Sequence, residues 1–215
     1  MWNITMNKFS DFEGVVESFD QIRQQLGEVA PAVKNKVLSQ LDEVCESFIQ
    51  LSPFVVIGTS GSQGQSLSPK GDPAGFVKIL SPNYIAIPDR PGNRRADTFE
   101  NLLENPKIGL MFVVPGKAET LRISGEARIV TDKKVTQSME VRGHVPEFAI
   151  VVHIESAFIH CPKCMQRSKL WKPDFWQDSS HLDSIGEAMI KHAKLDISPE
   201  VLDAIAEKEG LKKLY

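Results

Sequence analysis

The segment Asn83–Val114, NYIAIPDRPGNRRADTFENLLENPKIGLMFVV, decides the fold that we expect for this chain of 215 residues. We predict a strand over Tyr84–Ile87, because a short apolar run is followed there by Pro88, which cannot donate to a β-ladder. Ile108–Val114 is an apolar run of strand length and is predicted to be a buried strand. Between these strands the pattern predicts a charged loop and then a short helix.

The charged loop, PDRPGNRR over residues 88–95 and called the arginine loop below, places three arginines directly before the predicted helix. Asp97 and Glu100 resemble a capping box at the helix start, and Asn105-Pro106 ends the helix. Helix N-termini present unpaired N–H groups and partial positive charge, and arginine matches the oxygens of phosphate. We therefore expect a phosphate at this loop. The alternative is a solvated turn with ordinary surface ion pairs.

Short apolar runs separated by turn residues continue on both sides of this segment. Further strands are predicted over residues 54–59, 75–80, 119–130 and 149–159, and a paired strand is expected to begin over residues 65–68. This pattern favours an antiparallel barrel or sandwich. Residues 119–130 alternate between apolar and polar side chains, as a half-buried strand does. Gly125 stands in the apolar row, where a glycine is typical of a bulge or a barrel corner.

Helical spacing of apolar residues occurs at both ends of the chain. It predicts helices over residues 15–26 and 32–50, and a short helix that begins near Ile185. Ser198-Pro199 is expected to open a last helix, with the serine as its cap and the proline in its first turn.

Composition excludes several classes of protein. The net charge of −3 and the pI of about 6.0 do not suggest a nucleic-acid partner, so the arginines indicate a small anionic ligand. No apolar run approaches the roughly 18 residues that span a bilayer, and we see no signal peptide. Three cysteines do not make a disulfide framework. We expect a cytoplasmic protein that binds neither membrane nor nucleic acid.

Two later motifs also bear side chains that could take part in chemistry. Cys161 and Cys164 have the spacing of zinc or redox pairs, but no second pair lies nearby, so structural cysteines are favoured and no metal is expected. Cys45 falls in the helix predicted over residues 32–50 and is expected to be an inert buried thiol. Arg167 and Trp171 are four residues apart and could clamp a flat ring from one helical face. The alternative is packing plus a surface charge.

Four blocks of the sequence resemble the pyridoxamine 5'-phosphate oxidase-like family of FMN-binding split barrels, and an uncharacterised branch of it most of all. The blocks are SPKGDPAGFVKI (68–79), PDRPGNRRADTFENLLENPKIGLMF (88–112), PGKAETLRISGEARIV (115–130) and HCPKCMQRSKLW (160–171). The resemblance covers roughly residues 30–173. It implies a mainly β fold with helical additions (α+β), a six-stranded antiparallel split β-barrel with helices at the N- and C-terminal ends. It departs from the family at Cys164 and lacks the C-terminal pattern specific to the substrate of the true oxidase.

We therefore expect a single domain over residues 1–215, with N-terminal helices at 1–50, the barrel at 51–173 and a helical extension at 174–215. The resemblance also implies a homodimer with FMN at the interface. By position within the matched blocks, it implies the cofactor contacts Ser68, Lys70, Lys78, Pro88, Asp89, Arg90, Asn93, Arg94, Arg95, Arg167 and Trp171.

The implied activity is hydride transfer between reduced nicotinamide, NADH or NADPH, and an unknown small substrate. The alternative is a non-catalytic flavin-, haem- or deazaflavin-binding protein on the same fold. No residue is identified as a general acid or base.

Overall fold

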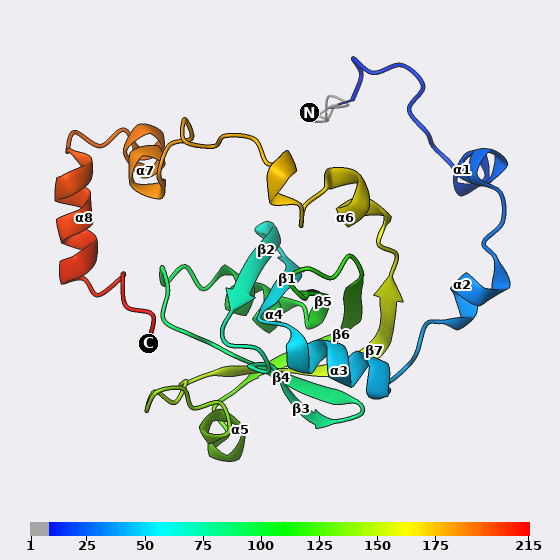
Figure 1. The fold of residues 1–215 in the computed structure, drawn as a ribbon, viewed down its shortest axis with the longest axis horizontal. Helices are drawn as coiled ribbons and strands as arrows, with labels where there is room; N and C mark the ends of the chain where they lie inside the picture. The colour runs from blue at the N-terminus through cyan, green and yellow to red at the C-terminus, as the bar shows by residue number, and fades with distance from the viewer. Residues whose placement is uncertain (1–8) are drawn as a thin grey trace, which may run out of the picture. The chain divides into compact units, whose positions relative to one another are not determined.

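The computed structural model describes residues 9–215, and the chain divides into two compact units, Met1–Lys36 and Val37–Tyr215 (Figure 1). The described part of the first unit contains α1 (Phe19–Leu26) and α2 (Pro31–Asn35). The second unit contains the sheet, a 3-10 helix (Pro173–Phe175) and the helices α3 (Glu43–Leu51), α4 (Asp97–Glu104), α5 (Lys133–Gln137), α6 (Lys163–Ser168), α7 (Ile185–Ala193) and α8 (Pro199–Lys208). No helix in the described range 9–215 is long and apolar enough to cross a membrane.

The described strands form one antiparallel sheet in the order β2-β1-β5-β6-β7-β4-β3 (Figure 1). They are β1 (Phe54–Gly61), β2 (Gly64–Gly71), β3 (Lys78–Ser81), β4 (Tyr84–Pro88), β5 (Lys107–Val113), β6 (Thr120–Val130) and β7 (Ala149–His160). The predicted antiparallel α+β architecture is present, but this sheet has seven strands where six were expected. The strand expected to begin over residues 65–68 is β2, which reaches Gly71 and pairs with β1 along its whole length although its sequence GQSLSPKG lacks an apolar run.

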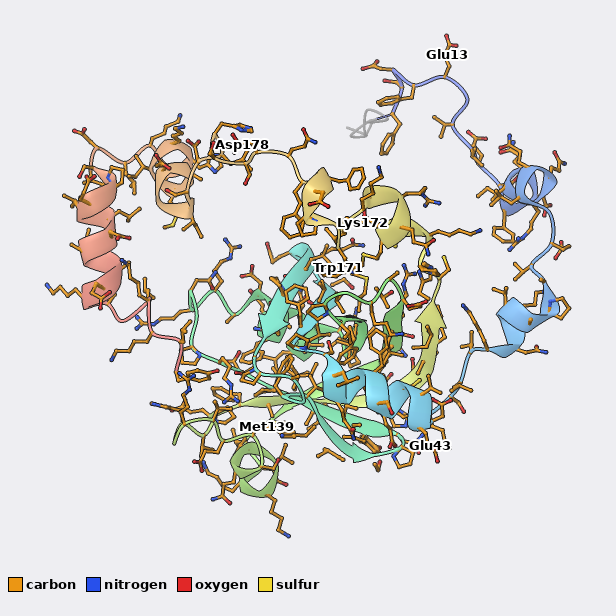
Figure 2. All side chains as sticks on the ribbon, in the orientation of Figure 1. Glu13, Glu43, Met139, Trp171, Lys172 and Asp178 are labelled. Atoms are coloured by element: carbon orange, nitrogen blue, oxygen red, sulfur yellow. The ribbon has the colours of Figure 1, made fainter. Side chains whose placement is uncertain are left out.

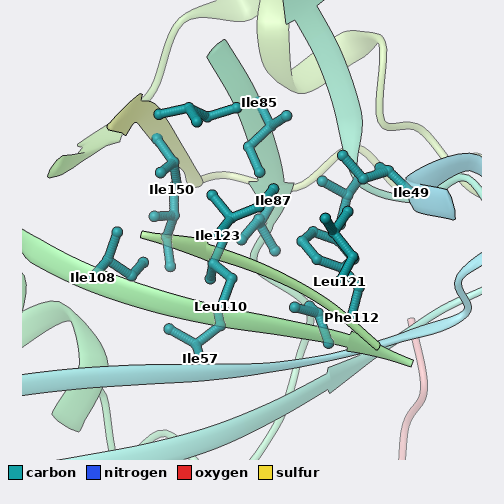
Figure 3. Packing of buried hydrophobic residues seen from close by; sticks show 14 of the residues in the cluster. Ile49, Ile57, Ile85, Ile87, Ile108, Leu110, Phe112, Leu121, Ile123 and Ile150 are labelled. Atoms are coloured by element: carbon teal, nitrogen blue, oxygen red, sulfur yellow. The ribbon is translucent and has the colours of Figure 1, made fainter. Parts of the chain in front are cut away.

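The larger of two buried hydrophobic clusters in the described residues forms the main core, and Figure 3 shows its packing. The central strands supply the fully buried Phe112 and Leu121, and Ile57 and Ile87 come from strands on either side of them. Ile49 of α3 joins the same cluster. Each such side chain contributes about 1.5–3 kcal/mol when it leaves water. The core therefore holds β1, β4 and α3 to the central strands and fixes the loops that connect them.

Gly125 allows a break in the pairing of β6 with β7. The register shifts between Ser124, which pairs with Ser156, and Gly125, which pairs with Ile154. A Cβ atom on residue 125 would lie 1.9 Å from the carbonyl oxygen of His153, closer than any side chain can approach. The expected bulge at Gly125 is therefore confirmed, and close backbone approach is its physical reason.

The prediction of one continuous helix over residues 32–50 is wrong, because the structure has two helices there with a break between them. α2 ends at Asn35 and α3 begins at Glu43. Between them Leu38 pairs with Ala157 of β7, with N–H to carbonyl distances of 2.9 and 2.8 Å in the two directions. Asp42 then caps α3 by accepting the N–H of Cys45 at 2.9 Å. Pairing with a distant strand replaces helical hydrogen bonds that the local apolar spacing favours.

The helices at the C-terminal end begin where the sequence predicts. Ser184 and Glu187 form a capping box at the start of α7, and Ser198 caps α8 with Pro199 in its first turn. Neither helix has a buried residue. Local capping therefore stabilises these two helices more than burial in the core does.

Candidate functional site

A cleft of about 390 Å³ lies between β2 and the arginine loop. Ser68 and Lys70 line it from β2, on the same face of the strand because they are two residues apart. Asn93, Arg94 and Arg95 line it from the loop. Asp89 and Arg90 of the loop line it as well, so seven of the eleven predicted cofactor contacts surround one cleft, although 23 positions separate Lys70 from Asn93 in the chain.

The N-terminus of α4 forms the end of this cleft. Ala96 is the N-cap, with a φ of 59° in the left-handed region, and no side chain caps the helix. The capping box expected from Asp97 and Glu100 is therefore wrong, since Asp97 lies one position inside the helix. The carboxylate of Asp97 instead accepts from Arg95, at 3.0 Å from Nε and 2.8 Å from Nη2. An uncapped helix start beside two arginines suits an anion.

Arg90 has a different environment from the other two arginines. Its Nε lies 2.6 Å from Oδ2 of Asp72, and its Nη2 donates to the carbonyl of Met139 at 2.7 Å (Figure 2 labels Met139). The side chains of Arg90 and Asp72 are only 14% and 2% exposed. Those of Arg94 and Arg95 are 70% and 71% exposed. Arg90 therefore anchors the loop, while Arg94 and Arg95 can reach a ligand.

Asp89 is the acidic side chain of the loop itself. Burial raises the pKa of its carboxyl, and the ammonium of Lys70, 3.7 Å away, acts in the opposite direction. Asp89 brings a negative charge into the cleft beside Lys70, as Asp97 does beside Arg95. Asp89 therefore reduces the positive potential beside Lys70.

Not all predicted contacts reach the cleft. Pro88 ends β4 just before it, while Lys78 lies on β3 and donates to the carbonyl of Gly75 at 3.2 Å. Arg167 lies in α6, and the indole N–H of Trp171 donates to the carbonyl of Lys117 at 2.7 Å (Figure 2). Lys78, Arg167 and Trp171 do not line the cleft within one chain.

Sequence reasoning also missed other residues that line the cleft, among them Ser66, Thr98 and Phe99. Ser66 could have been found from the alternation of β2, since it shares a face with Ser68. Thr98 and Phe99 could have been found only with the correct start of α4.

The cysteines lie away from the cleft. Cys45 is buried in the core, as expected, and burial raises the pKa of its thiol to about 11. Cys161 and Cys164 are exposed and form no disulfide. Within residues 9–215, no three His, Cys, Asp or Glu side chains come together as a metal site would require.

An antiparallel sheet with a cationic cleft at the start of an inserted helix defines a protein suited to a small anionic ligand. The sequence profile of the pyridoxamine 5'-phosphate oxidase family matches residues 41–161, more than half of the chain. The protein belongs to this family, and the matched range includes the whole arginine loop and β2.

Several solved structures are also similar. HupZ of Group A Streptococcus is 19% identical, with a TM-score of 0.45 over 55% of this chain and 93% of that one. General Stress Protein 26 of Bacillus anthracis is 12% identical, with a TM-score of 0.41 over 53% of this chain and 88% of that one. An F420 reductase is 14% identical, with a TM-score of 0.41 over 54% and 98%. None of the curated proteins is similar enough in sequence to match this chain.

Proposed function

We propose that this protein is an FMN-binding flavoprotein whose arginine loop holds the phosphate of the cofactor. The observation that carries the proposal is the cleft, where Ser68 and Lys70 face Asn93, Arg94 and Arg95 beside the uncapped start of α4. Membership of the pyridoxamine 5'-phosphate oxidase family supports it.

The donor set of the cleft fits a phosphate. Three cationic side chains, Lys70, Arg94 and Arg95, would approach it together with the hydroxyl of Ser68 and the N–H groups at the helix start. Arg95 has to share its guanidinium with Asp97, but that pair is exposed and is worth at most about 1 kcal/mol. A phosphate dianion that accepts several charge-assisted hydrogen bonds outcompetes such a pair.

We infer that the activity is hydride transfer between NADH or NADPH and a small substrate. FMN supplies the hydride chemistry when bound. The protein's share is to fix the phosphate through the arginine loop, so that the ring is held in one orientation and at one distance from the substrate. No residue of the cleft is assigned as a general acid or base.

We also propose that two copies of the chain form a homodimer with the cofactor between them. Support comes from Arg167 and Trp171, which the family resemblance assigns to the flavin ring but which lie outside the cleft of their own chain. A second copy could present them to it.

The cofactor is tested by the visible absorbance spectrum after incubation with FMN and removal of the excess. The wild type should retain flavin bands, and Arg94→Ala/Arg95→Ala should lose them. Arg122→Ala, which removes an exposed arginine from β6, is the matched control and should retain them. Flavin bands in all three proteins would refute the phosphate assignment. Retained flavin without oxidation of NADH or NADPH by any offered acceptor would support the non-catalytic alternative.

The dimer is tested by mixing two inactive variants. Arg94→Ala/Arg95→Ala and Arg167→Ala/Trp171→Ala should each bind FMN poorly. If the two halves of a site come from different subunits, subunit exchange in an equal mixture should restore about a quarter of the sites. No recovery in a mixture that has exchanged subunits would contradict a shared site.

A further inference from the structure

The segment that follows α8, Glu209–Tyr215, contacts the arginine loop at two points. Arg94 donates through Nη2 to the carbonyl of Glu209 at 3.1 Å, and its Nη1 lies 3.9 Å from the carboxylate of the same residue. The hydroxyl of Tyr215 donates to Oδ1 of Asp72, whose other oxygen holds Arg90. The segment is therefore joined to both the anchored and the exposed arginine of the loop.

The ring of Tyr215 packs against two arginines and a histidine. Another cavity, of about 320 Å³, is lined by Asp89, Arg90 and Pro91 of the loop, and Tyr215 is also one of its lining residues. The guanidinium carbons of Arg90 and Arg142 lie 5.7 and 5.6 Å from the ring centroid, and the ring of His144 stacks on it at 6.3 Å and 27°. Cation–π contacts and the bond to Asp72 make Tyr215 the anchor of the segment.

Little else holds this end of the chain. α7 and α8 pack on each other, and neither has a buried residue. The contact at Arg94 is also exposed, since the side chains of Arg94 and Glu209 are 70% and 55% accessible. Exposed pairs of this kind contribute little to stability and are readily exchanged for a stronger partner.

We propose that Glu209–Tyr215 is a latch that occupies Arg94 through Glu209 and is displaced from it by the anionic group of the ligand. The inference rests on the proposed function, because it assigns Arg94 to the phosphate. Glu209 presents a carbonyl and a carboxylate to the guanidinium that the proposed function assigns to the phosphate, so ligand and latch compete for that one guanidinium. Tyr215 keeps the segment close to the loop and thereby raises the local concentration of the competitor.

One substitution tests Glu209 as the competitor for Arg94 and another tests Tyr215 as the anchor of the segment, and each has a matched control. Glu209→Gln removes the competing charge, with Glu207→Gln on α8 as its control. FMN should bind Glu209→Gln about two- to five-fold more tightly than wild type in a fluorescence titration, as the loss of an exposed ion pair implies. Equal affinities of Glu209→Gln, its control and the wild type would overturn the competition.

Tyr215→Phe removes the hydroxyl that bonds to Asp72, and Tyr84→Phe removes the other tyrosine hydroxyl of the chain as its control. Hydrogen exchange, measured without added ligand, should show amides of residues 199–215 exchanging about tenfold faster in Tyr215→Phe only. Unchanged exchange would overturn the latch. Added FMN should also speed exchange there in the wild type. If FMN bound neither the wild type nor any variant, the proposed function would be wrong. Hydrogen exchange of Tyr215→Phe, measured without ligand, would still test the latch.

Discussion

At the scale of single residues, the absence of a side chain at Gly125 allows the bulge in the pairing of β6 with β7. The carbonyl of His153 occupies the place of a Cβ atom at residue 125. Gly109, on the adjacent strand β5, has nothing within 4 Å of the same position. The two glycines therefore differ in their surroundings and not in their chemistry.

We predict that Gly125→Ala lowers the free energy of unfolding by at least about 3 kcal/mol, because the backbone of β6 or β7 must move. Gly109→Ala should change it by less than about 1 kcal/mol. Urea denaturation of both variants measures the difference. Equal losses would show that close approach at Gly125 is not what the bulge requires.

The three cysteines should react at very different rates with a thiol reagent at pH 8. Burial raises the pKa of the Cys45 thiol to about 11, so at pH 8 almost none of it is the reactive thiolate. Cys161 and Cys164 are exposed. We predict two fast-reacting thiols in the native protein and a third that reacts only in denaturant. Cys45→Ala should remove the slow thiol alone, and a fast loss of signal from Cys45 would contradict its burial.

The arginines of the loop should separate into structural and binding residues. Arg90→Ala leaves the buried carboxylate of Asp72 without its cation and should cost about 3–5 kcal/mol of stability. Arg94→Ala removes an exposed side chain and should cost less than about 1 kcal/mol while it weakens FMN binding. Thermal melts and flavin titrations of both variants test this assignment. Destabilisation by Arg94→Ala as large as that by Arg90→Ala would contradict it.

The sequence could not have separated these arginines. All three lie within one stretch of six residues. Arg90 is distinguished only by Asp72 and the carbonyl of Met139, which lie 18 and 49 positions away. The position of the site could be predicted from the local run of charge, but the role of each arginine depends on contacts distant in sequence.

At the scale of elements, α4 is the helix that the site depends on, and one buried hydrogen bond ties it to the sheet. Nδ2 of Asn101 donates to Oγ1 of Thr59 on β1 at 3.1 Å. Both residues are buried. The bond therefore fixes the helix against β1, with its N-terminus at the cleft.

We predict that Asn101→Ala lowers the free energy of unfolding by about 1–3 kcal/mol, because it leaves the hydroxyl of Thr59 without this partner. Asn101→Ala/Thr59→Val should cost less than the sum of the two single substitutions, because both remove the same bond. A double-mutant cycle by urea denaturation measures the coupling. Strict additivity would show that the bond does not hold α4 in place.

Elements with a strong local pattern could be predicted, and elements defined by distant pairing could not. The alternation over residues 119–130 predicted β6, the apolar spacing from Ile185 predicted α7, and the Ser198 cap predicted the start of α8. The helix over residues 32–50 was wrong because Leu38 pairs with Ala157, more than a hundred positions away. β2 carries no apolar run, so only its pairing with β1 identifies it as a full strand.

At the scale of the whole molecule, charge is distributed unevenly. The chain as a whole carries −3, yet the cleft gathers Lys70, Arg94 and Arg95 in one place. This uneven distribution could be predicted from the sequence, because three arginines stand within six residues of a chain with net negative charge.

The central claim is that the arginine loop recognises the phosphate of a flavin, and the most direct test compares FMN with riboflavin, which lacks only that phosphate. Fluorescence titrations should show FMN binding at least about 100-fold more tightly than riboflavin to the wild type, as expected when several charge-assisted hydrogen bonds are lost. Arg94→Ala/Arg95→Ala should bind the two with nearly equal affinity. Equal affinity of the wild type for FMN and riboflavin would contradict the account.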